Sequence, residues 1–438
     1  MKKTKHNRRD FIKRTSGAIA GLAAFPYFIP SSIIGRNKII SPSDKIRIGC
    51  IGVGWQGTGN MEAFLRENDT EVVAICDIDK NHLENGKRIV NTYYDNNDCK
   101  TYHDYKEILA RKDIDVFSIG LPDHWHGIIS IAAAKAGKDI FGEKPLSHNL
   151  LEGRALCDAV KRYGRIWQTG SWQRSRSNFR FGSELVRNGR IGKVHTVEVG
   201  LPSGHSDFGG SHANAPVPKE LDYERWLGPA PYSPYAPARV HKSWRWHLDY
   251  GGGQLMDWVG HHGDIAHWGL GFDNMGPVEI SGYGEYPKTG LWNSATKYRV
   301  DSKYADGTKM IVAGGHSDVC NGTTGTKWIG DEGWLWVNRG GQIDSSNKLL
   351  LKDKIAPNEI HLLKSPGHAR NFLNCVRSRK ETIAPCETAH RSASIGHLGQ
   401  IAMLVGRKIK FNPETEEIIG DTVASRLLGR PMRTPYHL

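Results

Sequence analysis

The sequence has little cysteine, and what it has is not arranged as a disulfide framework. The seven cysteines among 438 residues are odd in number and widely spaced, and no C-x-x-C pair occurs. Small secreted scaffolds held by disulfides carry dense, paired cysteines, so that class is excluded. Cys50 and Cys76 fall in predicted strands, where a thiol acts as a small apolar residue. The distribution is typical of a chain that folds in a reducing cytoplasm.

The chain also lacks a charge excess along most of its length. Of the net charge of +13, residues 1–38 contribute +8, from nine Lys and Arg and one acid, which leaves about +5 for the other 400 residues. A nucleic-acid-binding protein needs a basic patch or stripe, and we therefore expect no nucleic-acid partner. Beyond the first 40 residues no segment is apolar enough to span a bilayer, and no internal repeat is present.

The first 40 residues have the pattern of a leader rather than of a folded domain. Segment 7–13, NRRDFIK, resembles a twin-arginine export signal, and the apolar stretch 17–29 is too short for a membrane span and contains Pro26. Segment 18–20 fits the small-x-small rule for cleavage but lies early in that stretch, so retention of the leader as a membrane anchor stays open. We predict a periplasmic or exported protein whose partner is the twin-arginine machinery.

Segment 45–79 predicts a strand, a glycine turn, a helix and a second strand that ends in an acid. Gly52, Gly54 and Gly57 have the G-x-G-x-x-G spacing, and Asp77 follows Gly57 by 20 residues. In a dinucleotide-binding unit these glycines allow a tight turn, close approach to the pyrophosphate and helix packing, and the helix N-terminus attracts the phosphates. Asp77 can accept hydrogen bonds from ribose hydroxyls and would repel a 2′-phosphate, which favours NAD over NADP. We expect further cofactor contacts from the loop residues Trp55 and Gln56.

The alternation of strands and helices up to residue 165 predicts a parallel, doubly wound sheet. Further strands are expected at 114–119 and 138–142, and helices at 128–136 and 150–163. A glycine turn in another kind of parallel sheet is the alternative. The predicted division is a leader at 1–40, an NAD-binding Rossmann domain at 41–165 and a substrate-binding, catalytic domain at 166–438.

After residue 165 tryptophan and glycine become more frequent, and short β-like runs predict a mainly antiparallel sheet interrupted by helices. The runs lie at 194–199, 278–283, 297–300, 310–312 and 328–337, and the helices at 255–268, 368–379 and 392–405. The fold class is therefore α/β, with a Rossmann sheet followed by a second domain.

Lys144 follows the last predicted Rossmann strand in the segment Gly-Glu-Lys-Pro. Ligands of an open parallel sheet bind outside the carboxyl ends of its strands, so Lys144 is expected near the nicotinamide and the substrate, with Glu143 beside it. A surface lysine is an equal alternative.

The segment Leu-Pro-Asp-His-Trp-His at 121–126 follows the strand at 114–119, on the same side of the sheet. Two histidines two residues apart could suggest a metal. We prefer a loop that packs against the dinucleotide through Pro122, His124 and His126, with His126 also opening the next helix.

A predicted helix at 255–268 carries polar side chains on one face. Asp257, His261, Asp264 and Trp268 recur at i, i+4, i+7 and i+11, as in a helix that lines a polar cleft. His261 can accept a hydroxyl proton as hydride leaves the same carbon, and an unperturbed imidazole titrates near neutral pH. Asp257 could orient or stabilise that imidazole, or bind a substrate hydroxyl.

Two other structural interpretations of this helix are open. One is a helix with an N-terminal acid and satisfied core histidines. The other is a metal site that also uses His262 and His267, and it is poorer because these residues lie about 100° to either side of the polar face. We predict no metal.

These segments together resemble the Gfo/Idh/MocA oxidoreductase family, and in particular its exported members, over essentially all of residues 40–438. The resemblance implies a Rossmann domain, a second α/β domain with a large open sheet, frequent homo-oligomers, and a nicotinamide cofactor used on sugars, polyols and glycosides. It also implies a catalytic group formed by Lys144, Asp257 and His261.

The predicted reaction is hydride transfer between NAD and a secondary hydroxyl of a sugar, glycoside or cyclitol. His261 is the acid/base, Lys144 stabilises charge on the reacting oxygen, and Asp257 positions hydroxyl and imidazole. An exported protein meets no free NAD pool, so we expect tightly bound NAD(H), reduced by one sugar and reoxidised by a second carbonyl compound. Three tryptophans are candidates for stacking on a sugar, with core packing as the alternative for each: Trp172, Trp244 and Trp246.

Two rival functions remain open at this point. The family includes NAD-dependent, redox-neutral glycosidases, whose helix start resembles Tyr-Pro-Thr-His, and 3-keto-glycosides can also be passed to a lyase. Residues 256–261, MDWVGH, depart from that pattern and favour the dehydrogenase. A non-catalytic sugar-binding scaffold is the second rival, but a scaffold has no need for Lys144, Asp257 and His261 together.

Overall fold

A computed structural model describes residues 41–206 and 210–438 of the chain. Residues 46–438 form one compact unit, and a short 3-10 turn, Pro42–Asp44, precedes it in sequence. The predicted leader at 1–40 lies outside the described residues. No helix in the described ranges is long and apolar enough to cross a membrane.

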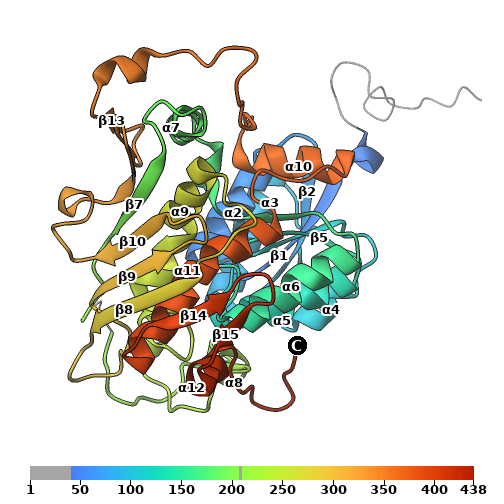
Figure 1. Cartoon of the computed structure of the whole chain (residues 1–438). Coiled ribbons are helices and arrows are strands. Elements are labelled where there is room, and N and C mark those ends of the chain that lie inside the picture. The colour runs from blue at the N-terminus through green and yellow to red at the C-terminus, as the bar shows by residue number, and fades with distance from the viewer. Residues whose placement is uncertain (1–40, 207–209) are drawn as a thin grey trace, which may run out of the picture. The chain divides into compact units, whose positions relative to one another are not determined.

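The first half of the unit is a six-stranded parallel sheet (Figure 1). Its strand order, β3-β2-β1-β4-β5-β6, is that of a Rossmann domain, as the sequence predicts. The elements are β1 (Ile46–Ile51), α2 (Trp55–Leu65), β2 (Thr70–Cys76), α3 (Lys80–Tyr94), β3 (Lys100–Tyr102), α4 (Tyr105–Leu109), β4 (Val116–Ile119), α5 (Asp123–Lys135), β5 (Asp139–Gly142), α6 (Leu150–Arg162) and β6 (Trp167–Thr169).

Helices cover both faces of this sheet, because its strands are almost continuously apolar. Helices α2 and α3 pack on one face, where they meet α10 (His368–Ser378) through Phe372 and Leu373. Helices α4, α5 and α6 pack on the other face. A segment far along the chain therefore completes the core of the Rossmann half.

The second half is a nine-stranded sheet in which only β7 and β10 pair in parallel. The mainly antiparallel sheet expected from the sequence is confirmed. Its strands are β7 (Val194–Leu201), β8 (Glu279–Glu285), β9 (Lys297–Lys303), β10 (Lys309–Gly314), β11 (Gly325–Gly330), β12 (Gly333–Val337), β13 (Ile343–Ser345), β14 (Ile409–Asn412) and β15 (Glu417–Ile419).

Helices α9 and α11 pack on one face of this sheet (Figure 1). The core between them combines Val259 and Ile265 of α9, Leu398 of α11 and strand residues such as Val300 and Trp328. The helices of this half are α7 (Ser177–Arg187), α8 (Tyr223–Leu227), α9 (Gly253–Leu270), α11 (Cys386–Val405) and α12 (Thr422–Ser425).

The predicted elements differ from the structure most clearly at four places. The run at 328–337 is a hairpin of β11 and β12, and a sixth Rossmann strand follows residue 165. Helix α11 begins six residues before Ser392, in a segment whose Glu387, His390 and Arg391 hide the apolar pattern. Helix α5 begins at Asp123, so residues 123–126 form its first turn rather than a loop.

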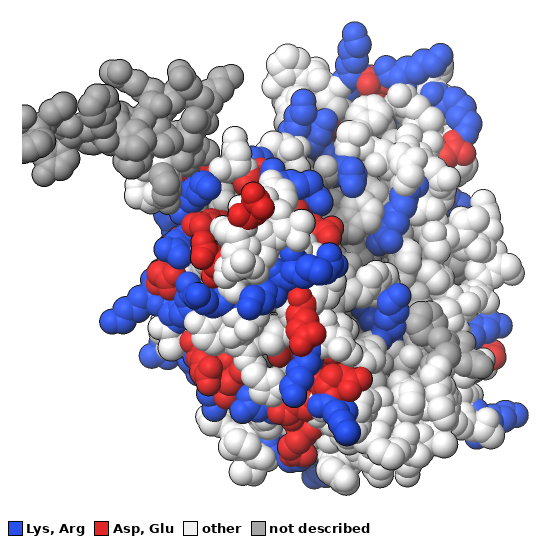
Figure 2. Space-filling model, turned by 180° about the vertical axis from the view of Figure 1, so that it is seen from behind, with Lys and Arg blue, Asp and Glu red and all other residues white. Residues whose placement is uncertain are grey.

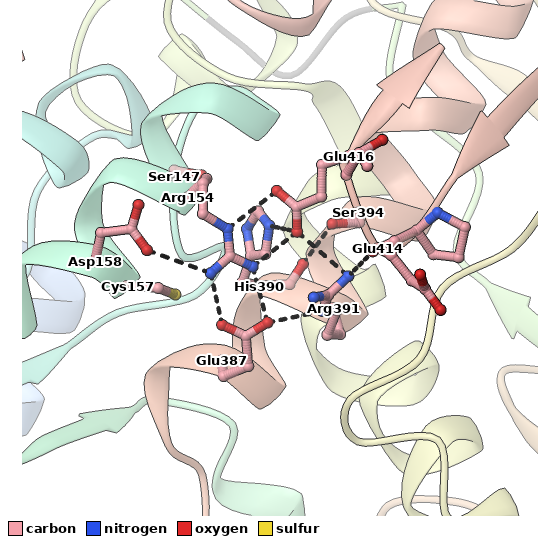
Figure 3. Close-up of polar contacts among 12 residues, drawn as sticks. Ser147, Arg154, Cys157, Asp158, Glu387, His390, Arg391, Ser394, Glu414 and Glu416 are labelled. Carbon is pink, nitrogen blue, oxygen red and sulfur yellow. Dashed lines mark hydrogen bonds and ion pairs between the residues drawn. The ribbon is translucent and has the colours of Figure 1, made fainter. Parts of the chain in front are cut away.

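A partly buried charge network joins the two halves between α6 and α11 (Figure 3). The Arg154 guanidinium donates two hydrogen bonds to Glu387 and two to Glu416, at 2.7–3.1 Å. Burial alone would raise the pKa of Glu416, but hydrogen bonds from His390 and Arg154 outweigh it and lower the pKa to about 2. Beside the network the thiols of Cys157 and Cys386 lie 3.1 Å apart.

The surface charge is mixed rather than of one sign. Figure 2 shows Lys and Arg interspersed with Asp and Glu over one half of the face drawn, with few acids over the other half.

Candidate active site

One cavity of about 660 Å³ follows the carboxyl ends of the Rossmann strands and reaches helix α9. Gly52 at the end of β1, Asp77 at the end of β2 and Lys144 after β5 all line it. Asp257 and His261 of α9 line its other wall. This is the place where ligands of an open α/β sheet bind, and the predicted catalytic residues meet most of the predicted cofactor residues there.

The glycine loop fits a dinucleotide. Gly52 has φ +79°, and a Cβ there would lie 2.3 Å from the carbonyl oxygen of Gly120. A Cβ on Gly57 would lie 1.9 Å from the carbonyl oxygen of Gly52, so only glycine lets α2 approach β1 this closely. Gly57 does not line the cavity; its role is this helix–strand contact.

The N-terminus of α2 is open toward the cavity. Its N-cap is Gly54, which offers no side-chain oxygen to the first N–H groups of the helix. Trp55, Gln56 and Gly54 line the cavity, and the Lys242 ammonium lies 4.3 Å from the centre of the Trp55 ring. Free N–H groups, the positive end of the helix dipole and nearby cations suit a pyrophosphate.

Asp77 lies at the position predicted for the carboxylate that binds the ribose, and it also fixes the nearby backbone. Its two carboxylate oxygens accept the backbone N–H groups of Val53, at 2.8 Å, and Asp79, at 2.9 Å. Each oxygen keeps a further lone pair for a ribose hydroxyl. Burial raises the pKa of Asp77, against the hydrogen bonds from its neighbours.

Lys144 and Asp257 form the ion pair at the centre of the site. The Lys144 ammonium lies 2.8 Å from Asp257 Oδ1 and donates to the Asp257 carbonyl at the same distance. Arg245 Nε donates to the same carboxylate oxygen at 3.1 Å. Burial would raise the pKa of Asp257, but these two cations outweigh it and lower the pKa to about 2, so the carboxylate is ionised.

His261 lies one helical turn beyond Asp257 and its pKa is not near neutral, contrary to the prediction. Burial, together with the nearby cations Lys144 and Arg339, lowers the pKa of His261 well below 6.5. Its Nδ1 has no hydrogen-bond partner in the described part of the chain, and no bond joins it to Asp257. The imidazole is therefore neutral, and Asp257 holds Lys144 instead of orienting the ring.

Glu143 and Pro122 line the cavity, but His124 and His126 do not. The His124 ring bonds the carbonyl of Trp226, and the His126 ring bonds the carbonyls of Pro145 and Leu121. Burial lowers the pKa of both rings. The prediction that these histidines face the dinucleotide is corrected: they fix the first turn of α5, and Pro122 and Asp123 line the cavity.

Of the three tryptophans predicted to stack on a sugar, two line the cavity and one does not. Trp172 and Trp244 line the cavity, whereas Trp246 is buried in a small core with Trp292 and Ala238. Trp246 is therefore a core residue rather than a residue that stacks on the substrate. Trp258, which the sequence reasoning did not single out, also lines the cavity.

The polar face of α9 faces the cavity only at its start. Asp264 is 1% exposed and accepts two hydrogen bonds from Arg174, at 2.7 and 2.9 Å. The Arg174 guanidinium lies over Trp268. The polar face of α9 therefore lines the cavity as far as His261, and one turn later its Asp264 forms a buried ion pair instead.

Arg245 and Arg339 are the important lining residues that sequence reasoning missed. Arg245 lies between two tryptophans that were candidates, and this Trp-Arg-Trp pattern was the available signal. Arg339 comes from the turn between β12 and β13, and nothing in its sequence neighbourhood points to a ligand.

One group of potential metal ligands occurs in the described ranges, formed by Asp79, His82 and His241. It lies at the cofactor end of the cavity. Asp79 already accepts the backbone N–H groups of Asn81 and His82 as the N-cap of α3.

A glycine-loop cavity beside a lysine, an ionised aspartate and a neutral histidine defines the class of dinucleotide-dependent oxidoreductases. The chain belongs to the Gfo/Idh/MocA oxidoreductase family: residues 46–171 match its NAD-binding Rossmann fold, and residues 183–438 match its C-terminal alpha/beta domain.

Named relatives share part of the chain. Myo-inositol 2-dehydrogenase of Thermotoga maritima is 31% identical over 183 residues, which are 42% of this chain and 49% of that protein. Glycosyl hydrolase family 109 protein 1 of Shewanella sp. strain MR-4 is 33% identical over 177 residues, 36% of this chain and 38% of that protein. The matched region thus spans half or less of these relatives.

Solved structures share the fold over most of the chain. The WlbA dehydrogenase of Bordetella pertussis, in complex with NADH and UDP-GlcNAcA, has a TM-score of 0.62 at 17% identity and covers 84% of this chain and 99% of that one. Aldose-aldose oxidoreductase of Caulobacter crescentus has a TM-score of 0.61 at 17% identity, covering 84% and 100%.

Proposed function

We propose that the protein transfers a hydride between NAD and a secondary hydroxyl or ketone of a sugar, glycoside or cyclitol. The observation that carries the proposal is the Lys144–Asp257 ion pair beside the neutral His261, on the cavity that the glycine loop opens into. When bound, the nicotinamide supplies the hydride acceptor or donor. Similarity to an inositol dehydrogenase supports the substrate class.

Each residue has a separate task in this proposal. Asp257, fixed by Arg245, holds the Lys144 ammonium at the cavity wall. Lys144 then donates to the reacting oxygen and stabilises negative charge on it. His261 is neutral and can accept the hydroxyl proton.

The test is the near-ultraviolet absorbance of reduced nicotinamide in NAD-loaded protein mixed with sugars and cyclitols. Lys144→Met and His261→Ala should each lower the rate of its appearance by roughly 10² or more. Asp113→Ser, in the Rossmann half but outside the cavity, is the control. Near-normal rates in both site variants would reject these roles.

A redox-neutral glycosidase, or a partner that forms keto-glycosides for a lyase, is the second candidate. It is favoured by similarity to the glycosyl hydrolase family 109 proteins. Release of free aglycone by the protein alone would support hydrolysis, whereas accumulation of a keto-glycoside would support the dehydrogenase.

Export would also shape the function. With no free NAD pool outside the cytoplasm, the protein should carry NAD(H) tightly bound and recycle it between one sugar and a second carbonyl compound. A solved fold neighbour is named as an aldose-aldose oxidoreductase, which is consistent with such recycling. We also propose export by the twin-arginine machinery, with or without an uncleaved anchor, and a homo-oligomeric assembly.

A further inference from the structure

The substrate end of the cavity holds a cation without an acidic partner. Arg339 lines the cavity, and none of the described carboxylates forms an ion pair with it. Its Nε donates to Gln173 Oε1 at 3.0 Å, while its Nη2 is buried and has no hydrogen-bond partner in the described part of the chain. A buried donor without a partner is costly and points to a missing acceptor.

The Arg339 side chain is held rigidly. Its guanidinium lies 4.2 Å from the centre of the Trp258 ring and 4.9 Å from that of Trp172. The turn that carries it is tied to α7, because Asn178 donates to the carbonyls of Asn338 and Gln342. Because Nε already donates to Gln173, the two terminal nitrogens of the planar guanidinium are the donors left for a ligand.

The other cations of this end have neighbours that account for them. Lys144 and Arg245 both bind Asp257. Lys242 lies over Trp55 at the N-terminus of α2, the end that suits the dinucleotide phosphates. Asp123 also lines the cavity, but burial raises its pKa well above 3.8, and it forms no ion pair with Arg339 in the described part of the chain.

We propose that the substrate carries a carboxylate, as in a uronic acid or its glycosides, and that Arg339 binds it. The inference rests on the proposed hydride transfer and names its substrate class. A carboxylate is planar and offers two oxygens to the guanidinium, whose Nη2 has no acceptor in the described part of the chain. The Trp172 and Trp258 rings that Arg339 covers lie 6.1 and 6.0 Å from the His261 ring, which places the carboxylate within one sugar ring of the reacting carbon.

The test compares kcat/KM for methyl hexuronides, their uncharged methyl esters and the parent hexosides, with NAD-loaded protein. The wild type should prefer the acid over its ester by roughly 10- to 100-fold, and Arg339→Met should abolish that preference. The acid-to-ester ratio within one variant does not depend on the fraction of folded protein. Arg176→Met is the matched control, because Arg176 also lies over Trp172 but does not line the cavity; it should keep the preference.

Three results would overturn the proposal. Equal rates on acid and ester in the wild type would do so, as would an unchanged preference in Arg339→Met. A hexose phosphate preferred over the hexuronide would assign the site to phosphate. If neutral sugars alone reduce the nicotinamide, the proposed hydride transfer stands and only the carboxylate fails; if no sugar of any charge does so, the proposed function fails.

Discussion

Asp257 holds Lys144 rather than His261, and this division of tasks changes the expected pH dependence. The pKa of His261 lies well below 6.5 because burial, Lys144 and Arg339 all disfavour the imidazolium. A lowered pKa means that the imidazole stays uncharged, and able to accept a proton, as the pH falls through 6.5.

We therefore predict that kcat/KM for sugar oxidation stays constant as the pH falls from about 8 through 6.5. The measurement is a pH–rate profile with NAD-loaded protein. A fall in rate centred near 6.5 in the wild type would show that His261 titrates normally and would contradict the structural account.

Asp77 supports a second prediction at the residue scale. Asp77→Ser removes the acceptor for the ribose hydroxyls and the charge that repels a 2′-phosphate. The dissociation constant for NAD should rise by about 10-fold or more, and the preference over NADP should shrink. Calorimetry with both dinucleotides checks this; Asp113→Ser should change neither affinity, and an unaltered preference in Asp77→Ser would assign the selectivity elsewhere.

At the scale of single elements, patterns with a strong local cause were predictable. Gly52, Gly54 and Gly57 follow from backbone sterics that act within one turn, and α6 and α10 follow from the spacing of their apolar residues. Helix α11 was predicted too short because Glu387, His390 and Arg391 are buried or partly buried in pairs that only the folded chain creates.

The charge network between α6 and α11 gives the prediction for this scale. Arg154→Met leaves Glu387 and Glu416 with too little positive charge in a partly buried site, and should cost about 2–3 kcal/mol of unfolding free energy. Arg407→Met removes an exposed pair with Asp421 and should cost clearly less than Arg154→Met. Urea denaturation measures both; equal costs would mean that the network adds no more than a surface pair.

At the scale of the whole molecule, the site depends on segments far apart in the chain. Lys144 could be placed from its strand, and Asp257 and His261 from one helix face. Their meeting depends on α11, which packs against α6 and β6 of the Rossmann half and against α9 of the second half. Arg339 could not be predicted, because a turn more than 190 residues after Lys144 delivers it. His124 was misplaced because a one-dimensional pattern cannot tell which side chains of a helical turn point away from the ligand.

Retention of the cofactor is the prediction for the intact protein. Freshly purified full-length chain should release NAD(H) on denaturation and should convert a sugar together with a second carbonyl compound without added NAD. Analysis of the released dinucleotide by chromatography checks this. Protein that releases none, yet needs added NAD for turnover, would refute the recycling proposal and leave hydride transfer untouched.

The most direct test of hydride transfer follows an isotope. NAD-loaded protein is mixed with sugars, uronides and cyclitols that carry deuterium on their ring carbons, and the dinucleotide is recovered by denaturation for mass spectrometry. We predict that reduced dinucleotide carries one deuterium, and that Lys144→Met yields almost none. A dinucleotide that gains no deuterium from any of these compounds, although it is bound, would contradict the central claim.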